Sequence, residues 1–172
     1  MTCDVAVHHL HLCDMDIGYF NPLCNFVPPL RSQRDRDELR AGLADGRINA
    51  VCSDHTPVDD DAKQMPFAEA EPGATGLELL LPLTLKWASE QKVSLLDALA
   101  RVTSDAASIM GITKGGHLGV GARADVCIFD ANAERTVSRE SLKSQGKNTP
   151  FLGISLPGVV RHTLVEGRVM LG

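Results

Sequence analysis

The sequence predicts an α/β fold that is followed by a small antiparallel β unit. Short apolar strands alternate with amphipathic helices in the first two thirds of the chain, an order typical of the closing βα units of a parallel barrel or open sheet. After Lys114 the pattern changes to turn glycines and short strands, which indicates antiparallel pairing. We therefore expect two parts, with βα units in residues 1–113 and the β unit in residues 114–172.

The first strands and the first helix follow from hydrophobic pattern and capping residues. Residues 5–12 mix β-branched residues with three histidines and predict a strand, and the apolar run 48–52 predicts a second, buried one. A long loop with three prolines, 14–29, lies between them. It is followed by an amphipathic helix over 34–44, which Ser32 caps and Gly46 ends.

A helical group closes the first part. Thr75 or Gly76 opens a strongly apolar helix that runs to residue 91, with Pro82 in its first turns or at a kink. Ser94 caps a short helix over 95–102, and Ser104 caps another that Gly111 closes.

The last part reads as strands separated by turns. Strands are expected over 126–129, 134–137 and 159–170, and Gly158 and Gly167 indicate hairpin turns.

Composition excludes several classes of function. The 172 residues carry a formal net charge of −5 and no basic run, so nothing supports nucleic-acid binding. No apolar stretch approaches the roughly 20 residues that span a bilayer, and the N-terminus lacks the pattern of a signal peptide, so we expect no membrane partner. Five scattered cysteines without a CxxC pair indicate neither a disulfide framework nor a thiolate zinc site. Cytoplasmic residence is the interpretation that follows.

The strongest chemical signal is a polar cluster directly after the strand 48–52. It delivers Asp54 and His55 at the carboxyl end of that strand, where α/β proteins place their chemistry. The alternative is a capped strand end with Asp54 in an Asx turn. His9 and His11 are two apart and share a face of the predicted strand, so they either join Asp54 at a metal or find ordinary polar partners. The glycine-rich segment 73–76 before a helix is compatible with an anion on backbone N–H groups.

A resemblance to a known family then covers nearly the whole chain. The segments that carry it are VAVHHLHL (5–12), VPPLRS (27–32), CSDHTP (52–57), KQMPF (63–67), EPGATGLELLLPL (71–83), GHLGVGARADVCIFD (116–130), NTPFLG (148–153) and VVRHTLVEGRVM (159–170). In this order they resemble the C-terminal part of the dihydroorotases and related cyclic amidohydrolases.

This resemblance implies a fold, a metal and a reaction. The fold is the C-terminal part of a (β/α)8 amidohydrolase barrel plus a portion of a small antiparallel β-sandwich. The metal is a binuclear zinc centre, and the reaction is the interconversion of carbamoyl-aspartate and dihydroorotate in pyrimidine biosynthesis. Asp54 matches the family's catalytic proton acceptor, which is also a metal ligand. We also take His55, Arg31, Pro72 and Gly73 as candidate substrate-binding residues, with a structural role for His55 and a loop-bracing salt link for Arg31 as the alternatives.

The departures from the family pattern shape the prediction. A complete barrel needs about 250 residues, and the family's other ligands, an HxH pair, a carboxylated lysine and two further histidines, are implied to lie upstream. Asp54 alone cannot hold a zinc ion, which takes about three protein ligands. Val58 stands where active members commonly carry a substrate-touching histidine, and Val27 where many carry asparagine.

We therefore predict a C-terminal fragment that is inactive as an isolated chain and binds no zinc stably by itself. Two alternatives remain for the parent protein. One is a non-catalytic homologue that acts as a scaffold for aspartate transcarbamoylase, and the other is a hydrolase of hydantoin-like or allantoin-like rings. Unpaired strand edges predict association with a second copy or with the missing N-terminal half.

Overall fold

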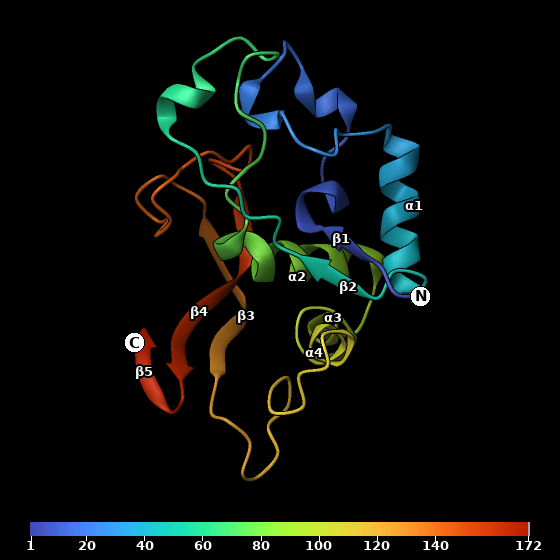
Figure 1. The fold of residues 1–172 in the computed structure, drawn as a ribbon, viewed down its shortest axis with the longest axis vertical. Coiled ribbons are helices and arrows are strands. Elements are labelled where there is room, and N and C mark those ends of the chain that lie inside the picture. Colours follow the sequence, from blue (N-terminus) through green and yellow to red (C-terminus); the bar gives the residue numbers. More distant parts are fainter. Residues whose placement is uncertain (172) are drawn as a thin grey trace.

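The computed structural model describes residues 1–171 and joins a small α/β part to a three-stranded antiparallel sheet, as Figure 1 shows. The fold class predicted from the sequence is confirmed, whereas the division between residues 113 and 114 stays a prediction. The elements are β1 (Asp4–Ala6), α1 (Gln33–Ala44), β2 (Ala50–Cys52), α2 (Leu80–Gln91), α3 (Leu95–Ala100), α4 (Ser104–Ile109), β3 (Val126–Thr136), β4 (Ser155–Val165) and β5 (Arg168–Leu171). Strands β1 and β2 pair in parallel, and β3, β4 and β5 form an antiparallel sheet in that order.

One hydrophobic core serves both parts of the chain. Trp87 and Leu83 of α2 are fully buried at its centre, where they meet Leu43 of α1 and Val51 of β2. The segment that joins β3 to β4 contributes Phe151 to the same cluster. Burial of these side chains is the main favourable term in the folding of such a domain. The antiparallel sheet is therefore attached to the α/β part through shared packing, not only through the chain.

Strand β1 is shorter than the sequence pattern predicts. It ends at Ala6, and Val7–Leu10 form a 3-10 turn in place of the expected strand over 5–12. All four residues of this turn are buried. Strand residues alternate between two faces, whereas here every side chain enters the core, which is why a pattern of period two does not describe the segment.

The predicted helices are present, and most of their caps are confirmed. Ser32 caps α1 through a reciprocal capping box with Asp35, and Ser94 caps α3 by accepting from the Asp97 N–H group at 3.1 Å. The apolar helix begins with a 3-10 turn over Leu77–Leu79 before α2. Ser104 is a correction, because it lies inside α4 and Thr103 occupies the N-cap without a side-chain hydrogen bond. Within the described residues, no helix has both the length and the apolar character needed to cross a membrane.

The antiparallel sheet is more continuous than expected. Strand β3 covers both segments predicted as separate strands, with irregular pairing between Asp130 and Glu134. The turn predicted at Gly167 is confirmed, since it lies between β4 and β5. Gly158 is not a turn residue. It lies within β4, where a Cβ atom would come within 2.5 Å of the Leu85 Cδ1 atom, so the glycine permits the sheet to approach α2 closely.

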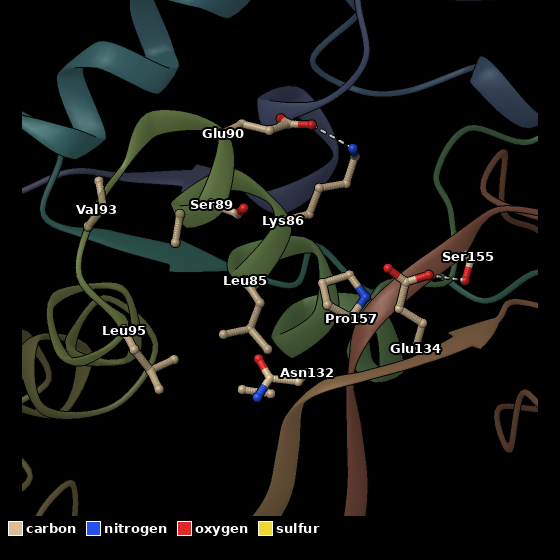
Figure 2. Close-up of a pocket in the computed structure, with 12 residues that line it drawn as sticks. Leu85, Lys86, Ser89, Glu90, Val93, Leu95, Asn132, Glu134, Ser155 and Pro157 are labelled. Carbon is tan, nitrogen blue, oxygen red and sulfur yellow. Dashed lines mark hydrogen bonds and ion pairs between the residues drawn. The ribbon is translucent and has the colours of Figure 1, made fainter.

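A depression of about 490 Å³ marks the junction of α2 with β3 and β4. Figure 2 shows Leu85 facing Asn132 and Pro157 across it, while an ion pair of 2.5 Å links Lys86 to Glu90 on the helix side. None of the residues predicted to be functional lines this depression. It is a feature of how the two parts meet and lies apart from the carboxyl ends of β1 and β2.

His11 connects the turn after β1 to helix α2. Its Nε2 atom donates to the Leu83 carbonyl oxygen at 2.9 Å, and its ring lies edge-on to Phe151 with centroids 6.2 Å apart. Burial lowers the pKa of His11 to about 4. The imidazole is therefore neutral in the folded protein at pH values where it is partly charged in the unfolded chain.

We predict that His11 makes the fold less stable in acid. As the pH falls from about 7 to about 5, the unfolded chain binds a proton at His11 that the folded protein does not bind, so the free energy of unfolding decreases by about 2 kcal/mol. In His11→Gln the amide still donates to Leu83 but does not titrate, and this part of the pH dependence should disappear. Urea unfolding of both proteins at the two pH values measures the difference, and equal pH dependence would contradict the prediction.

Candidate functional site

The site begins with two parallel strands that end side by side. Strands β1 and β2 pair with Ala6 opposite Cys52. His8 lies two residues after the end of β1, and Asp54 lies two residues after the end of β2. The two residues therefore occupy equivalent positions relative to the last strand pair. Parallel strands bring their carboxyl ends to the same edge of the sheet, so an imidazole and a carboxylate follow the same edge here.

Asp54 has a backbone conformation that its surroundings must maintain. Its φ angle of 44° lies in the left-handed region, which costs a residue with a Cβ atom about 1–2 kcal/mol, although Asp and Asn adopt it more readily than most. The side chain is partly exposed. Strained residues of this kind persist where neighbouring contacts over-determine the chain, and they cluster at functional sites.

His55 anchors the chain directly after Asp54. Its Nδ1 atom accepts hydrogen bonds from the N–H groups of Gly76 and Leu77, both at 3.1 Å, and His55 bridges to Ala74 as an isolated parallel pair. The neutral ring therefore carries its proton on Nε2, which is free to act as a donor. The sequence suggested that the backbone N–H groups of residues 73–76 bind an anion. The Gly76 N–H group is not available for this, because it donates to His55, as does the N–H group of Leu77.

His8 is the feature that the sequence did not single out. Its side chain is fully buried, with 0% of its surface exposed, and neither ring nitrogen has a hydrogen-bond partner. The ring lies between Phe26 and Phe151, with centroid distances of 5.1 and 6.0 Å. Burial, followed by the neighbouring His9, lowers the pKa of His8 to about 3, so the imidazole is neutral.

An unpartnered buried imidazole requires an explanation, because nearly all buried polar groups in proteins are hydrogen-bonded. A Cβ atom placed on Gly76 would lie 2.9 Å from the His8 Nε2 atom and 2.0 Å from the Ser53 carbonyl oxygen. These distances place the ring beside the turn that carries Asp54. A neutral imidazole with a free nitrogen is the form of histidine that binds metal ions.

The metal site considered for His9 and His11 is wrong. The His9 Nε2 atom donates to the Pro28 carbonyl oxygen at 3.0 Å, and His11 donates to Leu83. Because both residues follow the end of β1, the alternation of side chains along a strand does not apply to them. The sequence feature that could have indicated His8 is the parallel alignment of the two apolar runs, in which His8 and Asp54 occupy equivalent positions.

The residues present fit a metal ion but do not complete its coordination. His8 and Asp54 provide one nitrogen and one carboxylate ligand of the kinds that zinc accepts, and a catalytic zinc ion takes about three protein ligands. Within residues 1–171, no group of three or more His, Cys, Asp or Glu side chains lies close enough to hold a metal.

Only some of the residues predicted to bind substrate lie near Asp54 and His55 in the structure. Gly73 is buried next to Thr56, with a φ angle of +105° and no room for a side chain, while Pro72 is exposed beside it. Arg31 lies instead with Asp35 and Glu38 in a shallow depression at the start of α1, and no hydrogen bond or ion pair of the described residues joins it to Asp54 or His55. Substrate binding by these residues stays a prediction.

The chain is an α/β protein in which a histidine and an aspartate follow the carboxyl ends of two parallel strands. The chain belongs to the amidohydrolase family, whose model matches residues 40–171. It is 43% identical over its full length to a dihydroorotase-like protein of Pseudomonas putida and 38% identical over 99% of its length to a dihydroorotase of Geotalea daltonii. The L-hydantoinase (dihydropyrimidinase) of Arthrobacter aurescens matches 99% of the chain with a TM-score of 0.89 and 28% identity.

These comparisons also give the share of each relative's length that the chain covers. The chain spans about 40% of the length of each of the two curated relatives and 39% of the hydantoinase chain. The resemblance to dihydroorotases inferred from the motifs is confirmed by these matches.

We predict that Gly76→Ala disrupts the site. The new methyl group would overlap the Ser53 carbonyl oxygen and press on His8, so the loop must move, and the free energy of unfolding should fall by about 3 kcal/mol or more. Gly42→Ala in α1 is the matched control, because its Cβ atom would meet Ile48 at an ordinary 3.4 Å. That variant should be neutral or stabilised by up to about 1 kcal/mol. Chemical denaturation measures both, and equal stability of the two variants would refute the close approach at Gly76.

Proposed function

We propose that this chain is the C-terminal part of a metal-dependent hydrolase of cyclic amides, of the dihydroorotase type, with zinc as its metal. The observation that carries the proposal is the buried, unpartnered imidazole of His8 beside Asp54, at the carboxyl ends of two parallel strands. Membership of the amidohydrolase family and the named dihydroorotase relatives support it.

His8 and Asp54 would hold the metal from this part of the chain. When bound, zinc supplies a hydroxide at neutral pH and polarises the amide carbonyl. The upstream part of the parent protein would provide the remaining ligands. Such a divided site explains why two ligands occur here without a third.

Asp54 is suited to move the proton in both directions of the reaction. In ring opening, its carboxylate accepts a proton from the attacking water, and it returns that proton to the amide nitrogen as the C–N bond breaks. In ring closure the same steps run in reverse. The left-handed backbone and the anchor at His55 keep the carboxylate at the strand end.

His55 and Gly73 would define the substrate side of the site. With Nδ1 accepting from two backbone amides, the Nε2–H group of His55 can donate to a substrate oxygen. Gly73 packs against Thr56 with no room for a side chain, which brings its backbone close to the turn after Asp54. Pro72 would be part of the exposed rim beside Gly73, whereas Arg31 would act only as a more distant positive charge near the start of α1.

The proposed substrate pair is carbamoyl-aspartate and dihydroorotate, in pyrimidine biosynthesis. Val58 favours a second ring type, because its side chain makes no hydrogen bond to a carboxylate and a site that lacks an expected polar contact discriminates against the substrate that needs it. The hydantoinase structure that the chain matches supports hydantoin-like or allantoin-like rings as this alternative.

A different class of function is also supported by a specific observation. The P. putida relative and one from Pseudomonas aeruginosa carry the name dihydroorotase-like protein, and Val58 stands where active members commonly carry a histidine. The parent would then be a non-catalytic scaffold that binds aspartate transcarbamoylase. In either case the open edges of the β1–β2 pair favour association with the remainder of the barrel or with a second copy.

We predict that the natural-length protein contains zinc and hydrolyses a cyclic amide, whereas residues 1–172 alone do neither. Asp54→Asn should reduce kcat by about 10²–10⁴, because the proton acceptor is lost. His8→Gln should lower the zinc content of the purified protein, as measured by atomic emission.

Asp61→Asn is the control for the Asp54 variant, since it makes the same chemical change at an exposed position in the 3-10 turn Asp60–Lys63. It should retain full zinc content and turnover with both dihydroorotate and hydantoin. A natural-length protein that binds aspartate transcarbamoylase but holds no zinc and turns over no ring would replace the hydrolase by the scaffold.

A further inference from the structure

Asn148 is a buried amide at the meeting point of three chain segments. Only 3% of its surface is exposed. Its Nδ2 atom donates to the carbonyl oxygens of Thr56 at 2.9 Å and Gly73 at 3.2 Å. Its Oδ1 atom accepts from the Val58 N–H group at 3.1 Å and contacts the Thr75 hydroxyl at 3.1 Å. The hydrogen-bonding capacity of the side chain is therefore fully used.

This residue comes from the antiparallel part of the molecule. Asn148 lies in the connection from β3 to β4, which Figure 1 shows reaching up beside the loop that follows β2. Glu78 holds the connection by accepting from the N–H groups of Lys143 and Ser144, each at 2.6 Å. A Cβ atom on Gly146 would come within 2.8 Å of Val58 backbone atoms. The connection thus packs directly against the loop after Asp54.

The contacts of Asn148 bracket the two site residues. It fixes the chain two residues after Asp54, at Thr56, and again at Val58. Through Gly73 and Thr75 it also fixes the segment whose next amides bind His55. Asp54 has a left-handed backbone, so its direction depends on the anchoring of the residues that follow it.

We propose that Asn148 is a positioning residue: the connection between β3 and β4 sets the geometry of Asp54 and His55 through this one amide. The inference rests on the proposed function for its catalytic consequence. An amide is required because two acceptors and two donors of the surrounding segments must be matched at once. A carboxylate of the same shape can serve only the donors.

The test compares Asn148→Ala, which removes all four contacts, with Asn148→Asp, which keeps only the accepting half. Asn132→Ala, at an exposed position on β3, is the matched control. Amide hydrogen exchange should become at least about tenfold faster at Thr56, Val58 and Gly76 in Asn148→Ala, while amides that pair β3 with β4 keep their rates. Asn148→Asp should show a smaller increase, and the control none.

Turnover of the natural-length protein provides the second measurement. Both Asn148 variants should lose about tenfold to a hundredfold in kcat with a smaller change in KM, since misplacing a reacting group by a fraction of an ångström affects the chemical step. A purely structural role predicts a different result: faster exchange throughout the chain, with kcat per folded molecule unchanged.

Failure of this inference can be told from failure of the proposed function. If the wild-type natural-length protein has no turnover, the proposed function fails, and hydrogen exchange alone decides the role of Asn148. If both variants fail to fold, the wild-type exchange rates decide, since rapid exchange at Thr56 and Val58 would show that Asn148 does not hold them. Unchanged local exchange together with unchanged kcat overturns the inference.

Discussion

The parallel register of β1 and β2 is the constraint on which the candidate site depends. Each strand pairs over only three residues, yet their pairing fixes where both chains leave the sheet. His8 and Asp54 follow at equivalent positions, so a fully buried imidazole and a partly exposed carboxylate both lie after the carboxyl ends of this strand pair. Helix α2 packs against both strands, because Trp87 belongs to the same apolar cluster as Val5 of β1 and Val51 of β2.

The histidines around this edge differ in whether their ring nitrogens have hydrogen-bond partners. His9, His11 and His55 each bond a backbone group, which gives each ring a role in holding the fold. His8 has no such partner among the described residues. Leaving a buried polar group unpaired costs about 1–3 kcal/mol, a cost that a bound ligand removes. The contrast between His8 and its neighbours is therefore stronger support for a ligand than the number of histidines in the segment.

Local features were predictable from the sequence, whereas contacts between distant segments were not. Ser32 and Ser94 act on amides three residues away, so their caps could be predicted from neighbouring residues. The end of β1 and the burial of His8 depend on Phe26 and Phe151, which only the folded chain brings together. Asn148 bonds Val58 across 90 positions, and no local pattern indicates that pairing. Asp54 was predictable because the strand before it ends so abruptly.

The division of the site between segments has a consequence for the chain as a whole. Glu78 and Asn148 link the β3–β4 connection to the strand ends, and Phe151 of the same connection packs on His8. The connection between two strands of the antiparallel sheet thus packs directly against the strand ends that carry the candidate site. The chain spans about 40% of the length of two curated relatives, and within that span the β3–β4 connection is the segment that supports the strand ends. In the proposed function, the metal ligands would come from both parts, and metal binding would then be coupled to their folding together.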